Sequence, residues 1–118
     1  MEKALLFLLV LAITASACNH DAPFEGTWAG TYSGNDTGTW QIVIDADGAL
    51  NGIAYSNIIQ SNMAITGIVS NNGDLSATST TSTGAQFVGT LTDNTGSGTW
   101  TNQFGTFTFS GTWVGTKQ

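Results

Sequence analysis

The stretch G-T-W-Q-I-V-I-D-A-D-G-A-L-N-G-I-A-Y, residues 38–55, decides the fold class. It contains parts of two runs in which apolar and polar side chains alternate, 39–46 and 49–57, around the turn sequence D-A-D-G at 45–48. Alternation with a period of two is typical of a strand with one buried face and one wet face. Asp and Gly favour the tight turn that joins two antiparallel strands. This stretch therefore predicts a β-hairpin.

The same pattern continues along the chain, with turn signals at intervals of about 8–12 residues and no helical stripe. Such spacing is typical of a β-barrel or a β-sandwich. We expect an all-β fold, an antiparallel up-and-down meander of about eight short strands that forms a small barrel, with a β-sandwich as the alternative. The expected strands are 25–33, 39–46, 49–57, 63–70, 75–82, 85–92, 98–104 and 106–114.

Alternation also assigns one face of each expected strand to the interior. An eight-stranded barrel is just wide enough for side chains to fill it or for one small ligand to enter. Large aromatic side chains favour a packed core over a partly open cavity. The interior set is Trp28, Trp40, Ile42, Ile44, Leu50, Ala54, Met63, Ile65, Val69, Phe87, Leu91, Trp100, Phe107, Phe109 and Trp113.

The chain contains a short repeat: Gly-Thr-Trp occurs at 26–28, 38–40, 98–100 and 111–113. Further glycines lie inside expected strands at 52, 67 and 89. Glycine inside a strand marks a bend or a close approach of another group to the backbone. Bends of this kind would let a sheet of short strands curl and close, which hides its edges.

The composition excludes several classes of protein. Two Lys and eight acidic residues give a formal net charge of −6, and charged residues make up only 8% of the chain. Nucleic acid is therefore excluded as a partner, because its phosphates require a basic surface. One Cys cannot form a disulfide framework, and one Cys with one His cannot complete a zinc site.

The N-terminus has the pattern of a secretory signal. Met1–Lys3 ends in a basic residue, and residues 4–15 are almost wholly apolar. This run is shorter than the ~20 residues that a membrane-spanning helix needs. Its length and flanks are those of the apolar region of a signal peptide.

The sequence Ala15–Ser16–Ala17–Cys18 resembles the lipobox of bacterial lipoproteins, which prefers Leu where Ala15 stands. The resemblance implies that Cys18 becomes the acylated first residue and holds the chain on a membrane. Asn19 differs from the Asp that retains Gram-negative lipoproteins in the inner membrane, which implies an outer-membrane protein facing the periplasm or the cell surface. The alternative is an ordinary signal peptide, which would leave Cys18 as a free thiol on a secreted chain.

Side chains that carry catalysis are scarce in the expected barrel. The only His, His20, precedes it, the chain has no Arg, and one Lys, Lys117, lies at the end. Nucleophilic and acid–base catalysis need such groups. The Asp residues fall in expected turns, where their side chains bond nearby backbone N–H groups. We therefore expect no enzymatic activity, no catalytic residue and no cofactor.

One acidic pair is a candidate for calcium. Asp45-x-Asp47-Gly48 resembles the first half of a calcium-binding loop. The twelfth position counted from Asp45 is Ser56, where an EF-hand carries an acidic ligand. A looser metal site at Asp45 and Asp47 remains the expectation to test.

Two β-barrel families share short motifs with this chain. Gly26–Thr27–Trp28 resembles the G-x-W of the first lipocalin strand, and the stretch up to Gly52 is similar to the first hairpin of the avidin family. Both resemblances imply a calycin-like barrel. The biotin-binding residues of avidins are not matched, because Gly30 and Ala54 stand at two of those positions and no Trp lies between 40 and 100.

These observations predict a signal peptide at 1–17, a lipidated N-terminus and tether at 18–24, and a β-barrel domain at 25–118. The expected function is that of an envelope-anchored, non-enzymatic binding or structural module, which includes the case of an inhibitor that engages a protein partner through loops or an edge strand. One alternative is a calycin-like carrier of a small apolar ligand lined by Trp28, Trp40, Trp100 and Trp113. A second alternative is a calcium-dependent or carbohydrate-binding module.

Overall fold

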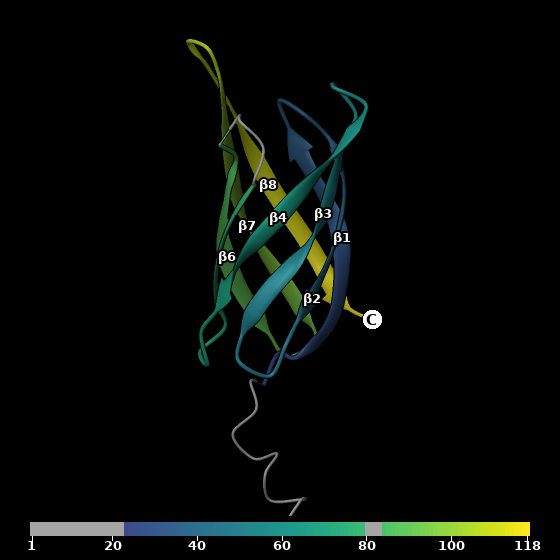
Figure 1. The fold of residues 1–118 in the computed structure, drawn as a ribbon, viewed down its shortest axis with the longest axis vertical. Helices are drawn as coiled ribbons and strands as arrows, with labels where there is room; N and C mark the ends of the chain where they lie inside the picture. The colour runs from purple at the N-terminus through teal and green to yellow at the C-terminus, as the bar shows by residue number, and fades with distance from the viewer. Residues whose placement is uncertain (1–22, 80–83) are drawn as a thin grey trace, which may run out of the picture.

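The computed structural model describes residues 23–79 and 84–118, which form eight antiparallel strands closed into one barrel (Figure 1). Each strand pairs with its neighbours in sequence, and the first pairs with the last to close the wall. The predicted all-β meander is confirmed, as a barrel and not a sandwich. The strands are β1 (Gly26–Gly34), β2 (Gly38–Ile44), β3 (Ala49–Ser56), β4 (Ser61–Val69), β5 (Asp74–Ser79), β6 (Gln86–Thr92), β7 (Thr95–Phe104) and β8 (Phe107–Lys117).

The strand bounds differ from the predicted ones mainly in the last hairpin. β7 begins at Thr95, three residues earlier than predicted, because Thr92 pairs with Thr95 and only Asp93 and Asn94 form the turn. Asp93 adopts a positive φ of 52° there, a conformation that Asp tolerates better than most residues. β8 continues to Lys117, where it completes the pairing with β1. The end of the predicted strand 75–82 lies outside the described residues.

The barrel has two chemically different ends. We call the end where the described chain begins the tether end; it consists of residues 23–25, the turns at 45–48, 70–73 and 93–94, and the C-terminus (Figure 1). The opposite end, the loop end, carries the turns at 35–37, 57–60 and 105–106. Within the part of the chain that the structure describes, no helix is long and apolar enough to cross a membrane.

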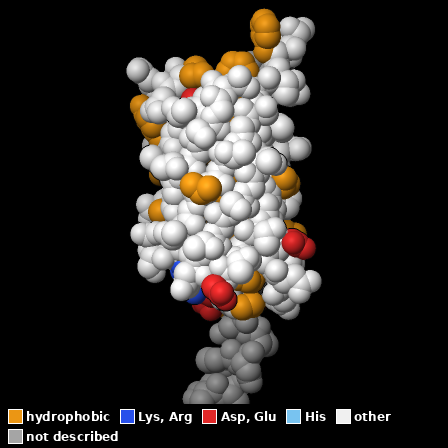
Figure 2. Space-filling model, turned by 180° about the vertical axis from the view of Figure 1, so that it is seen from behind, with side chains coloured by type: hydrophobic (Ala, Val, Ile, Leu, Met, Phe, Trp, Pro, Cys, Tyr) orange, Lys and Arg blue, Asp and Glu red, His pale blue; other side chains and the backbone are white. Residues whose placement is uncertain are grey.

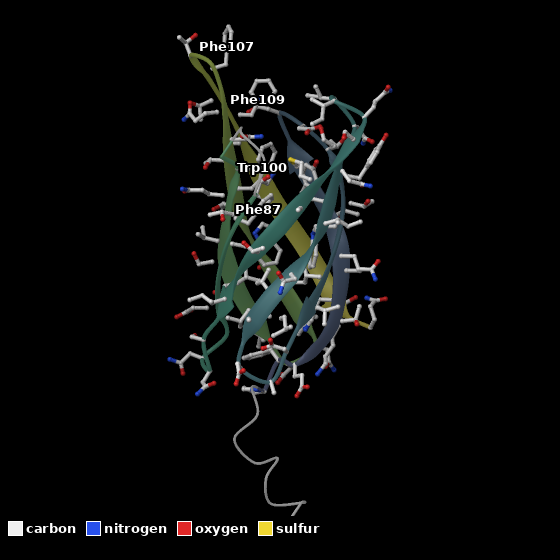
Figure 3. All side chains as sticks on the ribbon, viewed as in Figure 1. Phe87, Trp100, Phe107 and Phe109 are labelled. Carbon is white, nitrogen blue, oxygen red and sulfur yellow. The ribbon has the colours of Figure 1, made fainter. Side chains whose placement is uncertain are left out.

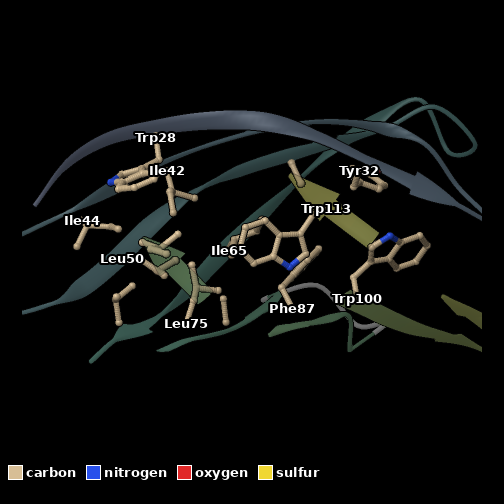
Figure 4. Packing of buried hydrophobic residues seen from close by; sticks show 14 of the residues in the cluster. Trp28, Tyr32, Ile42, Ile44, Leu50, Ile65, Leu75, Phe87, Trp100 and Trp113 are labelled. Carbon is tan, nitrogen blue, oxygen red and sulfur yellow. The ribbon is translucent and has the colours of Figure 1, made fainter. Parts of the chain in front are cut away.

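Apolar side chains from all eight strands fill the interior (Figure 4). The inward set predicted from alternation lies there with three exceptions: Trp40 in the middle of the barrel is only partly buried, and two more exceptions are near the loop end. Phe107 is 69% exposed and Phe109 is only partly buried. Sequence reasoning did not assign Phe24, Tyr32, Leu75, Ala77 and Ala85 to the core, where they are buried.

Phe107 is exposed because β7 and β8 extend beyond the wall. The register of β6 with β7 ends at Thr101, and that of β1 with β8 ends at Gly111. Residues 102–110 therefore continue as a two-stranded ribbon, which we call the projecting hairpin. Figure 3 shows Phe107 at its outer end and Phe109 nearer the barrel. Phe107 is therefore on the predicted inward face of its strand, but it lies beyond the end of the barrel wall.

Two of the four Gly-Thr-Trp copies have their glycine beneath an indole ring. Gly98 pairs with Trp113, and Gly111 pairs with Trp100, so that two copies of the motif face each other in antiparallel register. A Cβ at Gly98 would lie 2.7 Å from Cε2 of Trp113, and one at Gly111 would lie 2.7 Å from Nε1 of Trp100. These glycines thus mark the close approach of rings to the backbone, which leaves room for large side chains in a narrow barrel.

Candidate functional site

The four tryptophans predicted as ligand-lining residues lie at three levels of the barrel. Trp28 is at the tether end, Trp40 and Trp113 stack edge to face in the middle with ring centroids 5.6 Å apart, and Trp100 is near the loop end (Figure 4). Each indole N–H donates to a backbone carbonyl at 2.9–3.3 Å. The acceptors are Phe24 for Trp28, Thr31 for Trp40, Ser33 for Trp100 and Val88 for Trp113.

The interior contains little free space. A cavity of about 30 Å³ lies between Trp40, Trp113, Phe87 and the aliphatic side chains beneath them. Pockets for drug-sized ligands measure about 300–1,000 Å³. Trp28 and Trp100 do not line this cavity. The packed interior agrees with the filled core favoured by the sequence and leaves no room for a ligand of that size without rearrangement.

A buried carboxylate organises the loop end, which the sequence did not predict. The Asp36 carboxylate accepts three hydrogen bonds: from the Ser56 hydroxyl at 2.6 Å, from the Thr37 N–H at 2.7 Å and from the Ile58 N–H at 3.2 Å. Ser56 Oγ in turn accepts the N–H of Ile59 at 3.2 Å. The cluster thus fixes the turn at 57–60, which we call the isoleucine turn. From the sequence, only the position of Asp36 in a turn could be predicted.

Tyr32 completes this cluster. Its hydroxyl donates to the backbone oxygen of Tyr55 at 2.8 Å and lies 3.4 Å from Asp36 Oδ2. Its ring packs against Trp100 edge to face, with centroids 5.5 Å apart. Burial, with the negative charge of Asp36 adding in the same direction, raises the pKa of Tyr32 from 10.0 to about 12.

The raised pKa of Tyr32 predicts that the folded chain loses stability at alkaline pH. The folded chain keeps the Tyr32 proton between pH 10 and about 12, whereas the unfolded chain has lost it, so stability present below pH 10 is lost as the pH rises toward 12. We expect the urea midpoint of the natural chain to fall more steeply over that range than the midpoint of Tyr32→Phe. Urea unfolding of both chains at a series of alkaline pH values measures this. Equal slopes would show that Tyr32 ionises alike in both states.

The candidate calcium residues lie in the turn between β2 and β3. Oδ1 of Asp45 accepts the N–H groups of Asp47 at 2.9 Å and of Ala49 at 3.0 Å, and Asp47 is exposed. Asp45 therefore stabilises the turn in the way expected of Asp. Among residues 23–79 and 84–118, no three His, Cys, Asp or Glu side chains gather as a metal-binding group. The lipidation candidate Cys18 and His20 lie outside the described residues.

Exposed carboxylates gather at the tether end, whereas exposed apolar side chains occur along the whole barrel (Figure 2). Within the described part of the chain, the exposed acidic residues are at the tether end, and Asp36 at the loop end is buried. The loop end carries Phe107, and Ile58 and Ile59 are 54% and 45% exposed. The exposed acidic residues are Glu25, Asp45, Asp47, Asp74 and Asp93.

A second hollow lies on the outside of the wall, over β1 to β4. Its volume is about 320 Å³. No prediction from the sequence pointed to it, because its residues meet only through strand register. The lining residues are Ala29, Gly30, Thr39, Trp40, Gln41, Ile53, Tyr55 and Asn62.

Comparisons with protein-family models, with curated proteins and with solved structures found no match to this chain.

Proposed function

We propose that the chain is a non-enzymatic binding module, anchored to the cell envelope by a lipid on Cys18, that engages a protein partner through its loop end. The anchor rests on the sequence Ala15–Ser16–Ala17–Cys18 after an apolar segment. The described chain starts at Pro23, at the tether end of the barrel (Figure 1). A short tether there would hold this end near the membrane and present the loop end outward from it. An outer-membrane location, facing the periplasm or the cell surface, is part of this proposal.

In the described chain, the loop end has exposed apolar side chains and no exposed charge, and this contrast with the tether end carries the proposal. Exposed carboxylates surround the tether end. An acyl anchor on Cys18 would supply the attachment to the membrane, so this end would not need a basic surface. Phe107, Ile58 and Ile59 lie at the opposite end. Phe107 is on the projecting hairpin and the two isoleucines are on the isoleucine turn, which are separate protrusions of this end (Figure 1), and a partner that bridges them would cover all three side chains.

The two apolar protrusions are held in place before any partner binds. Asp36 and Ser56 accept the N–H groups of Ile58 and Ile59, which fixes the isoleucine turn. The base of the projecting hairpin is held by Asn35, whose N–H donates to Ser110 O at 3.0 Å and whose Oδ1 accepts Ser110 N–H at 2.9 Å. Rigid anchors lose less entropy on binding, which favours affinity.

The pairing of the strands determines the mode of binding. Neighbouring strands pair around the barrel, but the projecting hairpin, residues 102–110, extends past the registers of β6 and β1 and, within the described chain, has unpaired strand edges. Both routes considered from the sequence, loops and an edge strand, therefore remain at the loop end. An exposed Phe on a projecting hairpin suits insertion into an apolar recess of a protein, as aromatic anchors do in protein interfaces.

Photo-crosslinking on washed envelopes tests this function. A photoreactive phenylalanine analogue at position 107 is compared with one at position 68, because Ile68 is similarly exposed, at 65%, but lies on the wall in β4. We expect a discrete protein adduct from position 107 alone, lost when Ile58→Ser and Ile59→Ser are combined. Cys18→Ala should release the protein from the envelope.

Two results would contradict the proposal. Adducts of equal yield and size from both positions would show that the loop end has no special role. Retention of the Cys18→Ala variant in the envelope would show that no lipid on that residue holds the chain.

A further inference from the structure

The hollow on the outer wall combines apolar and hydrogen-bonding surface at one place. Strand register brings Thr39, Tyr55 and Asn62 into one row across β2, β3 and β4, and Gln41 stands opposite Ile53 in the next row. All five are outward-facing and exposed. The hollow of about 320 Å³ lies over these rows, within the range of small-ligand sites.

Tyr55 and Ile53 supply the apolar part of the lining, and they are 37% and 48% exposed on the outer face. Trp40 lies between the outward-facing Thr39 and Gln41. Its ring therefore points into the barrel, over Gly30 and against Trp113. Trp40 lines both this hollow and the internal cavity. Its N–H donates to Thr31 O at 3.3 Å, which holds the ring in place.

Three uncharged polar side chains supply the rest. Thr39, Gln41 and Asn62 carry a hydroxyl and two carboxamides, which together offer both donors and acceptors. In the described part of the structure, no side-chain hydrogen bond is formed by any of the three. These groups are therefore available to a ligand.

We propose that this hollow is a binding site for a neutral oligosaccharide. None of the eight lining residues is charged, so nothing in the lining would compensate an anionic or cationic ligand. A sugar ring presents a face of C–H groups that packs on an aromatic ring and a girdle of hydroxyls that hydrogen-bond to amides. Tyr55 offers the first kind of contact, and Gln41 and Asn62 offer the second.

Two other kinds of ligand fit this lining less well. A wholly apolar ligand would cover Thr39, Gln41 and Asn62 without offering them partners, and an unsatisfied buried polar group is unfavourable. An extended peptide would seek backbone partners, but β1, β2 and β3 are paired on both sides, and β4 is paired on both sides from Ile65 to Val69. The site goes beyond the proposed function, because it lies on the wall and not on the loop-end protrusions.

Titration of the purified full chain in detergent tests the site. The probes are cellohexaose, xylohexaose, mannohexaose, maltohexaose and chitohexaose, with a charged hexagalacturonate for comparison. Binding is followed by isothermal titration and by tryptophan emission, since Trp40 lines the hollow. We expect at least one neutral probe to bind and the charged probe to bind at least about ten-fold more weakly.

Variants then locate the binding. Tyr55→Ala should weaken it by about ten-fold or more, whereas Tyr55→Phe keeps the ring and should stay within about three-fold. Gln41→Ala and Asn62→Ala, which remove exposed side chains without ring contacts, should each weaken it several-fold. Val88→Ala is the matched control, because Val88 is an exposed apolar residue on β6, outside the hollow. Circular dichroism checks that each variant is folded.

Three results would overturn the site: no neutral probe binds, only the charged probe binds, or the lining variants bind as well as Val88→Ala does. None of these results depends on the protein partner of the loop end, which the crosslinking at position 107 tests separately. A failure of either proposal would therefore leave the other intact.

Discussion

Replacing Trp28 with alanine is expected to lower the free energy of unfolding by about 4 kcal/mol. Trp28 has no exposed surface, and its ring packs against Phe24 at a centroid distance of 6.4 Å. The change would leave a cavity at the tether end and remove the donor to Phe24 O, which lies 2.9 Å from Nε1. A domain of this size has a total stability of about 5–15 kcal/mol, so much of it would be lost.

Equilibrium unfolding in urea measures this loss. Trp28→Phe is the matched control, because it keeps an aromatic ring and most of the volume and should cost about half as much. A Trp28→Ala variant within about 1 kcal/mol of the natural chain would mean that Trp28 does not close this end of the core.

The class and order of the strands could be predicted from the sequence, because both depend on local patterns. The alternation in 38–55 and the D-A-D-G turn specify one hairpin whatever the rest of the chain does. Repetition of such hairpins gives a meander. Closure is different, because the pairing of Gly30 with Gly115 joins opposite ends of the chain, and neither segment alone indicates it. A sandwich therefore remained an alternative until the structure was in hand.

The error at Phe107 has a related cause. Alternation gives the face of a strand but not its height in the barrel. That height depends on the stagger between strands, which belongs to the closed wall as a whole. Residues 102–110 alternate like the rest of β7 and β8, but the registers of β6 and β1 end before them. The sequence therefore predicted the correct face for Phe107, but it could not show that the neighbouring strands end before they reach this residue.

Most of the candidate sites could not be predicted from the sequence either, because they too depend on the register between strands. Thr39, Tyr55 and Asn62 are separated along the chain and meet only in the register of β2, β3 and β4. Asp36 was predicted to lie in a turn, and it does. Nothing in the sequence around Asp36 shows that Ser56, at the end of the neighbouring strand β3, would bond to its carboxylate. Local rules found the turns, whereas the sites arise from contacts between strands.

Replacing Gly111 with alanine is expected to destabilise the barrel by about 3 kcal/mol or more. A Cβ there would overlap the carbonyl oxygen of Ser33 and lie 2.7 Å from Nε1 of Trp100. These two atoms form a hydrogen bond of 3.0 Å, so the added methyl group would press on both partners. Gly111 also pairs with Gly34, the last pair between β8 and β1. The change therefore strains the core and the closure of the wall together.

Thr112→Ala is the control for Gly111→Ala, because Thr112 is the next residue on the same strand and is exposed on the outer face. It should change the free energy of unfolding by about 1 kcal/mol at most. Combining Gly111→Ala with Trp100→Ala should cost less than the sum of the two single changes, since removal of the indole frees part of the space that the methyl group needs. Additive losses would show that ring and glycine act independently. Such a result would contradict the account of the facing copies of the motif, in which Gly111 is required by the indole of Trp100 that lies against it.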